Sequence, residues 1–480
     1  MEAVKLAGLE PAAVFGYFEK ICSIPHGSGN TKMISDYLVS FAKEHDLEYI
    51  QDELNNVILF GEGTCGMEDH APVILQGHMD MVCEKDADCP LDMDRDGLDI
   101  THDGGYVFAN GTTLGGDDGI AVAYALALLA DKSIPHPPLE VVITVDEETG
   151  LFGANGIDLS PLKGRMLINI DSEEEGIFTV SCAGGARASI SLPVERRAVY
   201  GPCIRLAVDG LQGGHSGVEI HMGRANANKI MGEFMSRIQK LMPLCLTSLS
   251  GGAKDNAIPR SCQATLVAMG IHLERINDIA AQLQAEIREQ YDEPEVTIQA
   301  FDVDALGGNS LTTECTAKII GLLCAAPNGV QAWSADIPGL VQTSLNMGVA
   351  KLGERFKITF SVRSSVNQEK EELLQQLRTL CAFYEGTYSQ SGEYPAWEYK
   401  QESPLRDTMV KVYTDMFGKE PKVLAIHAGL ECGLFSEKIP GMDCISIGPQ
   451  MYDIHTSRER LEIASTDRTW KFLLEVLKAL

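Results

Sequence analysis

The segment Pro72-Val73-Ile74-Leu75-Gln76-Gly77-His78-Met79-Asp80 carries the main architectural signal of this chain. Its apolar first half predicts a buried strand, and its second half places a histidine and a carboxylate where that strand ends. Two further apolar runs, residues 139–145 and 166–170, also lead directly into acidic residues. Near-continuous apolar strands alternating with helices are typical of an α/β fold with a mostly parallel sheet flanked by helices.

The ends of these strands are expected to form one cluster. In parallel sheets ligands bind beyond the carboxyl ends of the strands, so His78, Glu147 and Asp171 are predicted to lie at one edge. Between the first two, Leu114-Gly115-Gly116-Asp117-Asp118-Gly119 precedes an apolar helix at 120–130. Its glycines permit a tight turn, and helix capping explains one of its two acidic residues better than it explains both.

The pattern changes near residue 184 and returns to the first type after residue 398. The intervening part predicts two β-α-β-β-α-β units in tandem, the second beginning with a strand near 297–301. We therefore predict a catalytic metal-binding domain over 1–183 and 397–480. An α+β lid domain of tandem ferredoxin-like units is predicted to interrupt it over 184–396.

Charge and cysteine content restrict the class of partner. The chain has 39 basic and 68 acidic residues, and the net charge of −29 disfavours binding to nucleic acid and to anionic membranes. The 13 cysteines include no CxxC pair, which favours a reducing compartment. Neither a signal peptide nor an apolar run long enough to span a membrane is evident. We expect a cytoplasmic protein.

The acidic pair Glu147-Glu148 suggests metal-assisted hydrolysis. Adjacent residues point in different directions, so one carboxylate can bind a metal while the other takes a proton from water. Asp80 can orient the imidazole of His78 if the strand bends or ends there. Each signal alone is also explained by a satisfied core histidine or a solvated acidic group. The set of histidines and carboxylates suits zinc, with cobalt or manganese as substitutes.

The order of short motifs resembles the family of dinuclear zinc peptidases, which includes carnosine dipeptidases, aminoacylases and bacterial tripeptidases. The resemblance spans nearly the whole chain and is greatest for dipeptidases that act on Xaa-His substrates. The motifs are QGHMDMV (76–82), TTLGGDDG (112–119), VDEETGLFGA (145–154), NIDSEE (169–174), GGHSG (213–217), NAIP (256–259) and IHT (454–456).

This resemblance implies two divalent metal ions and a role for each matching residue. Asp117 would bridge the ions and Glu147 would be the general base for a metal-bridging water, while Asp80 would orient one histidine. The implied metal ligands are His78, Asp117, Glu148, Asp171 and His455. Gly116 and Asp118 depart from relatives that carry alanine and asparagine there, without removing a ligand.

The resemblance also implies substrate contacts from the lid. His215 would stabilise the oxyanion, Asn256 would contact the substrate, and Arg363 would bind its terminal carboxylate with two parallel hydrogen bonds. On residue pattern alone, His215 also fits an exposed histidine in a turn, and Arg363 a surface charge. Whether His215 acts within its own chain or from a partner in a homodimer stays open, as do the roles of His427 and Glu431.

Three functions follow as hypotheses. The first is metal-dependent hydrolysis of dipeptides with a free C-terminal carboxylate, including Xaa-His dipeptides. The second uses the same centre as an N-acyl amino acid amidohydrolase or a tripeptidase. The third, from another class, is a non-catalytic peptide-binding protein.

Overall fold

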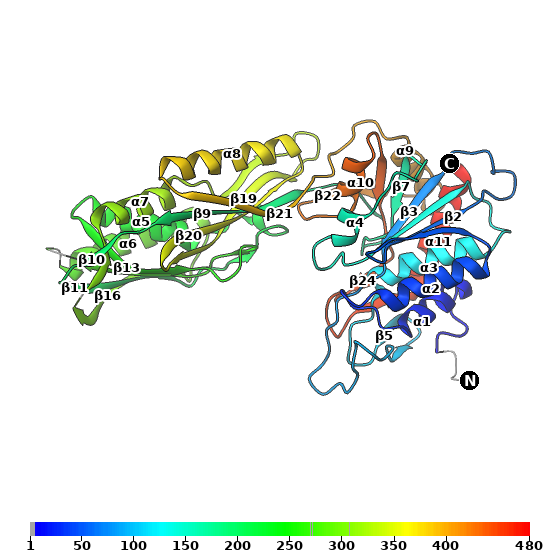
Figure 1. The fold of residues 1–480 in the computed structure, drawn as a ribbon, viewed down its shortest axis with the longest axis horizontal. Helices are drawn as coiled ribbons and strands as arrows, with labels where there is room; N and C mark the ends of the chain where they lie inside the picture. The colour runs from blue at the N-terminus through cyan, green and yellow to red at the C-terminus, as the bar shows by residue number, and fades with distance from the viewer. Residues whose placement is uncertain (1–4, 269, 271, 307) are drawn as a thin grey trace. The chain divides into compact units, whose positions relative to one another are not determined.

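The computed structural model describes residues 5–268, 270, 272–306 and 308–480, and the chain divides into two compact units (Figure 1). Unit 1 comprises Met1–Ser181, Tyr399–Ala425 and Leu430–Leu480. Unit 2 comprises Cys182–Glu398 together with Ile426–Gly429. The sequence-based domain limits place residues 426–429 with the catalytic domain, whereas in the structure these residues group with unit 2.

An eight-stranded sheet forms the centre of unit 1, in the order β1-β2-β6-β3-β7-β23-β8-β22. The strands β6, β3, β7 and β23 run parallel, whereas β1–β2, β2–β6 and β23–β8 are antiparallel pairs. The sheet is therefore mixed, because a short connection joins β1 to β2 as a hairpin. Its strands are β1 (Glu48–Gln51), β2 (Val57–Gly61), β3 (Val73–His78), β6 (Leu139–Thr144), β7 (Met166–Asn169), β8 (Ile177–Cys182), β22 (Lys422–Ile426) and β23 (Asp443–Ser446).

Helices cover this sheet, and every residue of β3 and β6 is buried. α3 packs on β3, α2 on β1 and β2, and α9 and α10 on β23. Gly77 allows the close approach of α3, because a Cβ there would lie 2.6 Å from Cβ of Ala121. The helices of unit 1 are α1 (Ala12–Cys22), α2 (Lys32–Glu44), α3 (Gly116–Ala130), α4 (Phe152–Gly156), α9 (Pro404–Phe417), α10 (Cys432–Lys438) and α11 (Ile463–Ala479).

A second, four-stranded sheet brings the C-terminal region to the start of α3. Its order is β24-β25-β5-β4, and Leu461 of β25 pairs with Val107 of β5. Since β5 precedes α3 in the chain, the loop between β24 and β25 lies beside the segment that leads into that helix. The strands are β4 (Ile100–His102), β5 (Tyr106–Ala109), β24 (Met451–Tyr452) and β25 (Arg460–Glu462).

Unit 2 contains a nine-stranded sheet in the order β16-β11-β15-β13-β19-β20-β9-β21, with β18 paired to β19. Short strands β12 (Gly214–His215) and β14 (Ala257–Ile258) form a separate pair, as do β10 (Arg196–Ala198) and β17 (Asn309–Leu311). The large sheet consists of β9 (Gly184–Pro193), β11 (Pro202–Asp209), β13 (Leu244–Gly251), β15 (Cys262–Ala268), β16 (Thr297–Leu306), β18 (Gly329–Trp333), β19 (Val341–Leu352), β20 (Arg355–Ser364) and β21 (Thr387–Tyr394).

Two β-α-β-β-α-β units are present in this sheet, but their arrangement corrects the tandem prediction. The first unit is β11-α5-β13-β15-α6-β16, so the strand expected to open the second unit in fact closes the first. The second unit takes β9 as its first strand and continues with α7, β19, β20, α8 and β21. One unit is thus inserted into the other. Hydrophobic periodicity identifies strands but not their partners, so the sequence pattern did not reveal this.

The two β-α-β-β-α-β units share one hydrophobic core. β13 pairs with β19 through Ser250 with Lys351 and Gly251 with Ala350, which makes the sheet continuous. Buried apolar side chains from the sheet and its helices form a single cluster that runs from Ala186 to Cys381. The helices are α5 (Ala227–Gln239), α6 (Leu273–Tyr291), α7 (Thr313–Ala325) and α8 (Asn367–Phe383). Unit 2 therefore has a core of its own.

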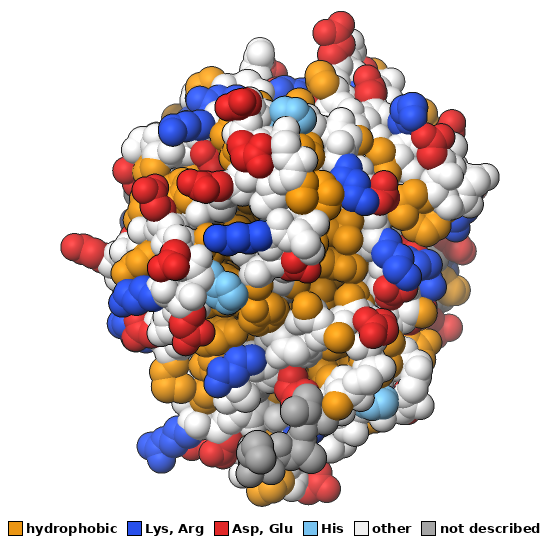
Figure 2. All heavy atoms as spheres, turned by 90° about the vertical axis from the view of Figure 1, so that its right-hand side faces the viewer, with side chains coloured by type: hydrophobic (Ala, Val, Ile, Leu, Met, Phe, Trp, Pro, Cys, Tyr) orange, Lys and Arg blue, Asp and Glu red, His pale blue; other side chains and the backbone are white. Residues whose placement is uncertain are grey.

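The surface bears charges of both signs. Figure 2 shows one face of the molecule, where acidic and basic side chains are interspersed around exposed apolar groups. On that face the described residues form no basic stripe of the kind that nucleic acid binding requires. Every helix in the described part of the chain is too short or too polar to cross a lipid bilayer.

Candidate metal centre

The carboxylate of Asp117 lies between two histidines. Its Oδ1 is 3.2 Å from Nε2 of His78, and its Oδ2 is 3.2 Å from Nε2 of His455. Glu148 reaches the second histidine, with Oε1 2.8 Å from Nε2 of His455, and Asp171 reaches the first, with Oδ1 3.5 Å from Nε2 of His78. The structure thus brings together all five residues expected as metal ligands, in two groups that share Asp117.

Neighbouring parallel strands bring three of the five residues, His78, Glu148 and Asp171, to one edge of the sheet. His78 is the last residue of β3 and pairs with Thr144, the last residue of β6, which is followed closely by Glu147 and Glu148. β7 pairs with β3 on the other side and leads into Asp171. The carboxyl ends of parallel strands converge at this edge, as the sequence pattern predicts.

Asp80 connects His78 to Glu147. Nδ1 of His78 lies 2.9 Å from the main-chain oxygen of Asp80 and 3.5 Å from its Oδ1. The same Oδ1 accepts a hydrogen bond from the backbone N–H of Glu147 at 3.1 Å, and Oδ2 accepts one from the Ser28 hydroxyl at 2.8 Å. β3 ends at His78, which satisfies the condition for an aspartate two residues later to orient that imidazole.

The electrostatic environment raises the proton affinity of Glu147. Burial raises the pKa of its carboxyl; the charge of His78 opposes this shift, while Asp171, Glu431 and Glu148 add to it. Hydrogen bonds to Asp117 and Glu148 raise the pKa of His455 to about 10. The positively charged form of this imidazole is therefore favoured between the two carboxylates.

The donor atoms fit divalent cations. In the described residues, ligand atoms of Asp117, Glu148 and His455 lie within 4.8 Å of one another, as do those of His78, Glu147 and Glu148. A third group of the same kind combines His78 with Asp118 and Asp171. Imidazole nitrogens and carboxylate oxygens are ligands of zinc and related metals, and the paired groups suit two ions.

Asp118 is hydrogen-bonded to the end of the strand that carries His78. It is fully buried, and its Oδ2 accepts a hydrogen bond from the backbone N–H of His78 at 3.2 Å. Burial and the charge of Asp171 raise the pKa of Asp118 well above its ordinary value. A Cβ at Gly77 would overlap the Asp118 carboxylate, so the glycine leaves room for that side chain.

Glu431 is a buried carboxylate whose role the sequence left open. Its Oε2 accepts hydrogen bonds from Nε2 of Gln76 at 2.5 Å and from the Thr144 hydroxyl at 2.7 Å. Burial raises its pKa to about 8. Gln76 and Thr144 lie on β3 and β6, so Glu431 connects the strands that carry His78 and Glu147.

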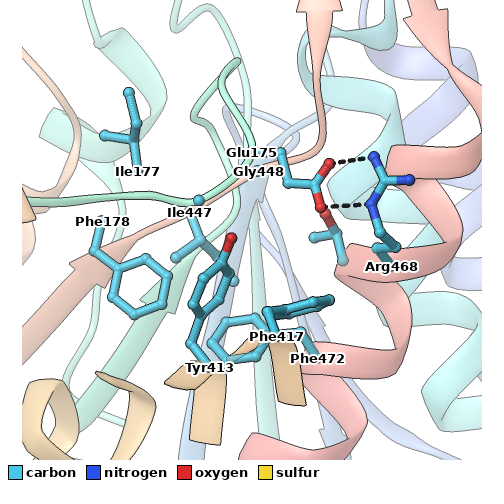
Figure 3. A pocket seen from close by; sticks show the side chains of 11 residues that line it. Glu175, Ile177, Phe178, Tyr413, Phe417, Ile447, Gly448, Arg468 and Phe472 are labelled. Atoms are coloured by element: carbon cyan, nitrogen blue, oxygen red, sulfur yellow. Dashed lines mark hydrogen bonds and ion pairs between the residues drawn. The ribbon is translucent and has the colours of Figure 1, made fainter. Parts of the chain in front are cut away.

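An ion pair anchors the loop that follows Asp171. Nε and Nη2 of Arg468 donate to the two carboxylate oxygens of Glu175 at 2.7 and 2.6 Å, as Figure 3 shows. Beside this pair lies a small cavity lined by the rings of Phe178, Tyr413, Phe417 and Phe472. The pair fixes α11 to the loop between β7 and β8, a structural role that the position of Glu175 in an acidic run does not reveal.

Glu459 is a residue of the site that the sequence pattern did not single out. It is 3% exposed, and burial and the charge of Asp117 raise its pKa to about 7 against the effect of backbone hydrogen bonds. The sequence feature that could have identified it is its position four residues after His455, within the loop that supplies that ligand.

In unit 2, His215 is held as a neutral hydrogen-bond donor. Its Nδ1 accepts from the backbone N–H groups of Gly217 and Val218 at 3.1 and 3.3 Å, which leaves the proton on Nε2. Burial and the charge of Arg363 lower its pKa. The pairing of β12 with β14 places His215 opposite Ala257, the residue after the exposed Asn256.

Arg363 belongs to the same polar group of unit 2. Its Nη1 donates to the Tyr394 hydroxyl at 3.2 Å, and its buried Nε has no hydrogen-bond partner among the described residues. Nε2 of His427 lies 2.7 Å from Oγ of Ser344. Burial and the charge of Arg363 lower the pKa of His427 to about 3, so this imidazole stays neutral. The group therefore presents one cation with two neutral histidines.

The chain is similar to characterised peptidases over its full length. The sequence pattern of peptidase family M20/M25/M40 matches residues 74–479. The cytosol non-specific dipeptidase of Escherichia coli (strain K12) is 37% identical over 479 residues, which is 99% of each chain. The crystal structure of aminoacylhistidine dipeptidase from Vibrio alginolyticus matches with a TM-score of 0.94 and 34% identity, over 99% of this chain and 98% of that one.

A more distant structure shares the fold alone. Aminopeptidase PepT from Bacillus cereus matches with a TM-score of 0.56 and 15% identity, over 98% of this chain and 99% of that one.

Proposed function

This chain belongs to peptidase family M20/M25/M40, and from that membership we propose that it hydrolyses dipeptides with a free C-terminal carboxylate, Xaa-His dipeptides included. The observation that carries the proposal is the position of Asp117, whose two carboxylate oxygens face His78 and His455 separately. A carboxylate in that position can serve two cations at once. The proposal assigns His78 and Asp171 to one ion, Glu148 and His455 to the other, and Asp117 to both.

In the proposed reaction two divalent ions, when bound, supply Lewis-acid activation of water and of the scissile carbonyl. Glu147 takes a proton from the attacking water and passes it to the leaving amine, which restores the carboxylate. Asp80 orients the imidazole of His78 and accepts a hydrogen bond from the backbone N–H of Glu147. It therefore fixes the positions of the base and the ligand relative to each other. We propose zinc as the native metal because of the mixed nitrogen and oxygen donors, with cobalt or manganese as substitutes.

We further propose that unit 2 is a lid domain whose residues recognise the substrate. The Nε2–H of His215 is a neutral donor suited to a developing oxyanion. Arg363 retains free donor capacity at Nε and suits a carboxylate, and Asn256 lies next to the strand pair that carries His215. The same proposal includes a catalytic domain over 1–183 and 397–480 and a lid domain over 184–396. It also includes a cytoplasmic location and assembly as a homodimer.

The experiment compares three substrate classes with one preparation of metal-reconstituted protein. An Xaa-His dipeptide, an N-acetyl amino acid and a tripeptide are assayed side by side, with Glu147→Gln as the matched variant. We expect the dipeptide to be the best substrate, and Glu147→Gln to lose at least about 100-fold in kcat because the proton acceptor is removed. Near-normal turnover by Glu147→Gln would refute the assigned base, and preference for the acylated amino acid or the tripeptide would refute the substrate class.

A further inference from the structure

The carboxylate of Glu459 accepts hydrogen bonds from the main chain that leads into Asp117. Its Oε2 accepts from the backbone N–H groups of Leu114 and Gly115 at 2.8 and 3.2 Å. Its Oε1 accepts from those of Gly116 and Asp117 at 2.8 and 3.4 Å. Four consecutive amides thus converge on a single side chain that is 3% exposed.

The backbone of this segment has the shape that such convergence requires. Gly115 has φ of 67° in the left-handed region, where glycine is favoured, and a Cβ at that position would lie 2.8 Å from Sδ of Met81. A Cβ at Gly116 would lie 3.2 Å from Oε1 of Glu459. Asp117 itself departs from helical geometry, with φ of −85° and ψ of 104°. Gly115 therefore supplies the left-handed turn beside Met81, and Gly116 leaves room for the carboxylate of Glu459.

The same short loop supplies both Glu459 and the ligand His455. His455 approaches the side chain of Asp117, with its Nε2 3.2 Å from Oδ2, whereas Glu459 holds the main chain of that residue. The backbone N–H of Glu459 donates to the carbonyl of Thr456 at 3.1 Å, which closes the loop between them. One loop therefore contacts both the side chain and the backbone of Asp117.

Amide dipoles are what stabilises this buried carboxylate. In the described part of the chain, no lysine or arginine forms an ion pair with Glu459. Its hydrogen-bonding capacity is instead directed at residues 114–117, so any displacement of that segment leaves a buried carboxylate unsatisfied. A large free-energy cost opposes such displacement.

We propose that Glu459 is a positioning residue of the metal centre, which holds residues 114–117 so that the two oxygens of Asp117 stay directed at His78 and His455. The proposal rests on the assignment of Asp117 as the shared ligand in the proposed function. Residues that orient metal ligands affect metal affinity by about 10- to 100-fold when they are replaced. Glu459 acts through Asp117 and does not itself contact a cation.

A buried carboxylate at the opposite end of the sheet offers a matched control. Glu140 is 4% exposed and accepts hydrogen bonds from the backbone N–H groups of Lys163 and Gly164 at 2.8 and 2.9 Å. It lies near the start of β6, where it pairs with Ile74, away from the strand ends that carry the ligands. Glutamine at this position removes the same charge and the same kind of acceptor, but leaves Asp117 alone.

The experiment measures metal binding to the full chain carrying Glu459→Gln or Glu140→Gln. Metal content, Co²⁺ affinity by chelator competition and the Co²⁺ visible spectrum are compared with those of the wild type. We expect Glu459→Gln to lower the affinity for at least one of two Co²⁺ ions by about 10- to 100-fold, because the shared ligand is displaced. The visible spectrum of the bound Co²⁺ should change for the same reason. Glu140→Gln is expected to bind both ions as the wild type does, and excess metal should restore activity to Glu459→Gln.

Two results would overturn the proposal. One is wild-type Co²⁺ affinity and spectrum in Glu459→Gln, and the other is an equal loss in Glu140→Gln, which would indicate general destabilisation. If Glu459→Gln does not fold, Glu459→Asp keeps the charge on a shorter side chain, and the proposal expects a smaller loss of affinity in the same direction. Metal binding is measured without substrate, so failure of the proposed dipeptidase activity would leave this readout intact and be recognised separately.

Discussion

Glu431 is fully buried, and only one of its two carboxylate oxygens has a hydrogen-bond partner among the described residues. Oε2 accepts from Gln76 and Thr144, so a proton is best placed on Oε1. Glutamine presents the same pattern, with an acceptor oxygen toward those donors and an amide group in place of the protonated oxygen. Glu431→Gln should therefore preserve the fold.

The pH dependence of stability tests this protonation state. The pKa of Glu431 is raised to about 8 in the folded protein, against about 4.3 for an unfolded chain. Between these values the folded state holds a proton that the unfolded state has released, so this group's contribution to stability falls as pH rises through that window, by at most about 1.4 kcal/mol per pH unit. Glu431→Gln should flatten this slope in urea unfolding of the metal-free protein at pH 5 to 8. The exposed Glu437→Gln serves as control, and an unchanged slope in Glu431→Gln would contradict the prediction.

Arg363 gives a prediction on substrate recognition. Replacing it with methionine removes a charged donor from the proposed carboxylate contact, at a cost of about 2 kcal/mol in kcat/KM for a dipeptide. The loss should appear mainly in KM, and a dipeptide amide, which lacks the carboxylate, should be hydrolysed equally by both proteins. Arg378→Met, a change at a more exposed arginine of α8, is the control. An equal loss for the acid and the amide would rule out the carboxylate contact.

Between elements, the ends of β7 and β23 meet so closely that a side chain is excluded. A Cβ on Gly448, just after β23, would overlap the backbone oxygen of Ser172, which follows Asp171. The backbone N–H of Ser172 also donates to the carbonyl of Ile447 at 3.2 Å. The two loops therefore pack main chain to main chain beside a predicted metal ligand.

Gly448→Ala should consequently lower both stability and metal affinity. The overlap is with backbone, so the strand ends must separate, at a cost of about 1–3 kcal/mol or more. Gly16→Ala is the matched control, because this glycine lies inside α1 with open space around it and should gain up to about 1 kcal/mol. Thermal unfolding and metal titration measure both variants. Equal effects of the two substitutions would show that the contact between the loops is unimportant.

At the level of the whole chain, the two units differ in what holds them together. All five proposed metal ligands belong to unit 1, whereas unit 2 has a core of its own. A ligand that binds only the folded form of one unit stabilises that unit. Removing metal with a chelator should therefore lower the unfolding temperature of unit 1 and leave that of unit 2 unchanged.

Calorimetry with and without chelator measures this difference. Residues 182–398 expressed alone would identify the transition of unit 2, because the ends of that fragment lie side by side. The backbone N–H groups of Cys182 and Trp397 donate to each other's carbonyls at 3.1 and 3.2 Å. A single transition that shifts as a whole on chelation would show that the two units do not unfold independently.

The sequence was sufficient for the features that depend on local pattern. Apolar runs that end in His78, in Glu147-Glu148 and in Asp171 predict parallel strands, and parallel strands bring their ends together, as the structure has them. The apolar helix expected at 120–130 likewise lies within α3 (Gly116–Ala130), because helix-forming patterns are local. The assignment of roles to these residues relied on resemblance to a family.

Other features arise only from contacts between residues distant in sequence. β9 joins strands that follow it by more than 140 positions, so the insertion of one β-α-β-β-α-β unit into the other is invisible in periodicity. Glu459 looks like an ordinary acidic residue in the chain, and the sequence leaves the role of Glu431 open. Their importance comes from burial, of Glu459 against residues 114–117 and of Glu431 against Gln76 and Thr144. Local pattern sets which segments form strands and helices, whereas the partner of a buried polar group depends on long-range packing.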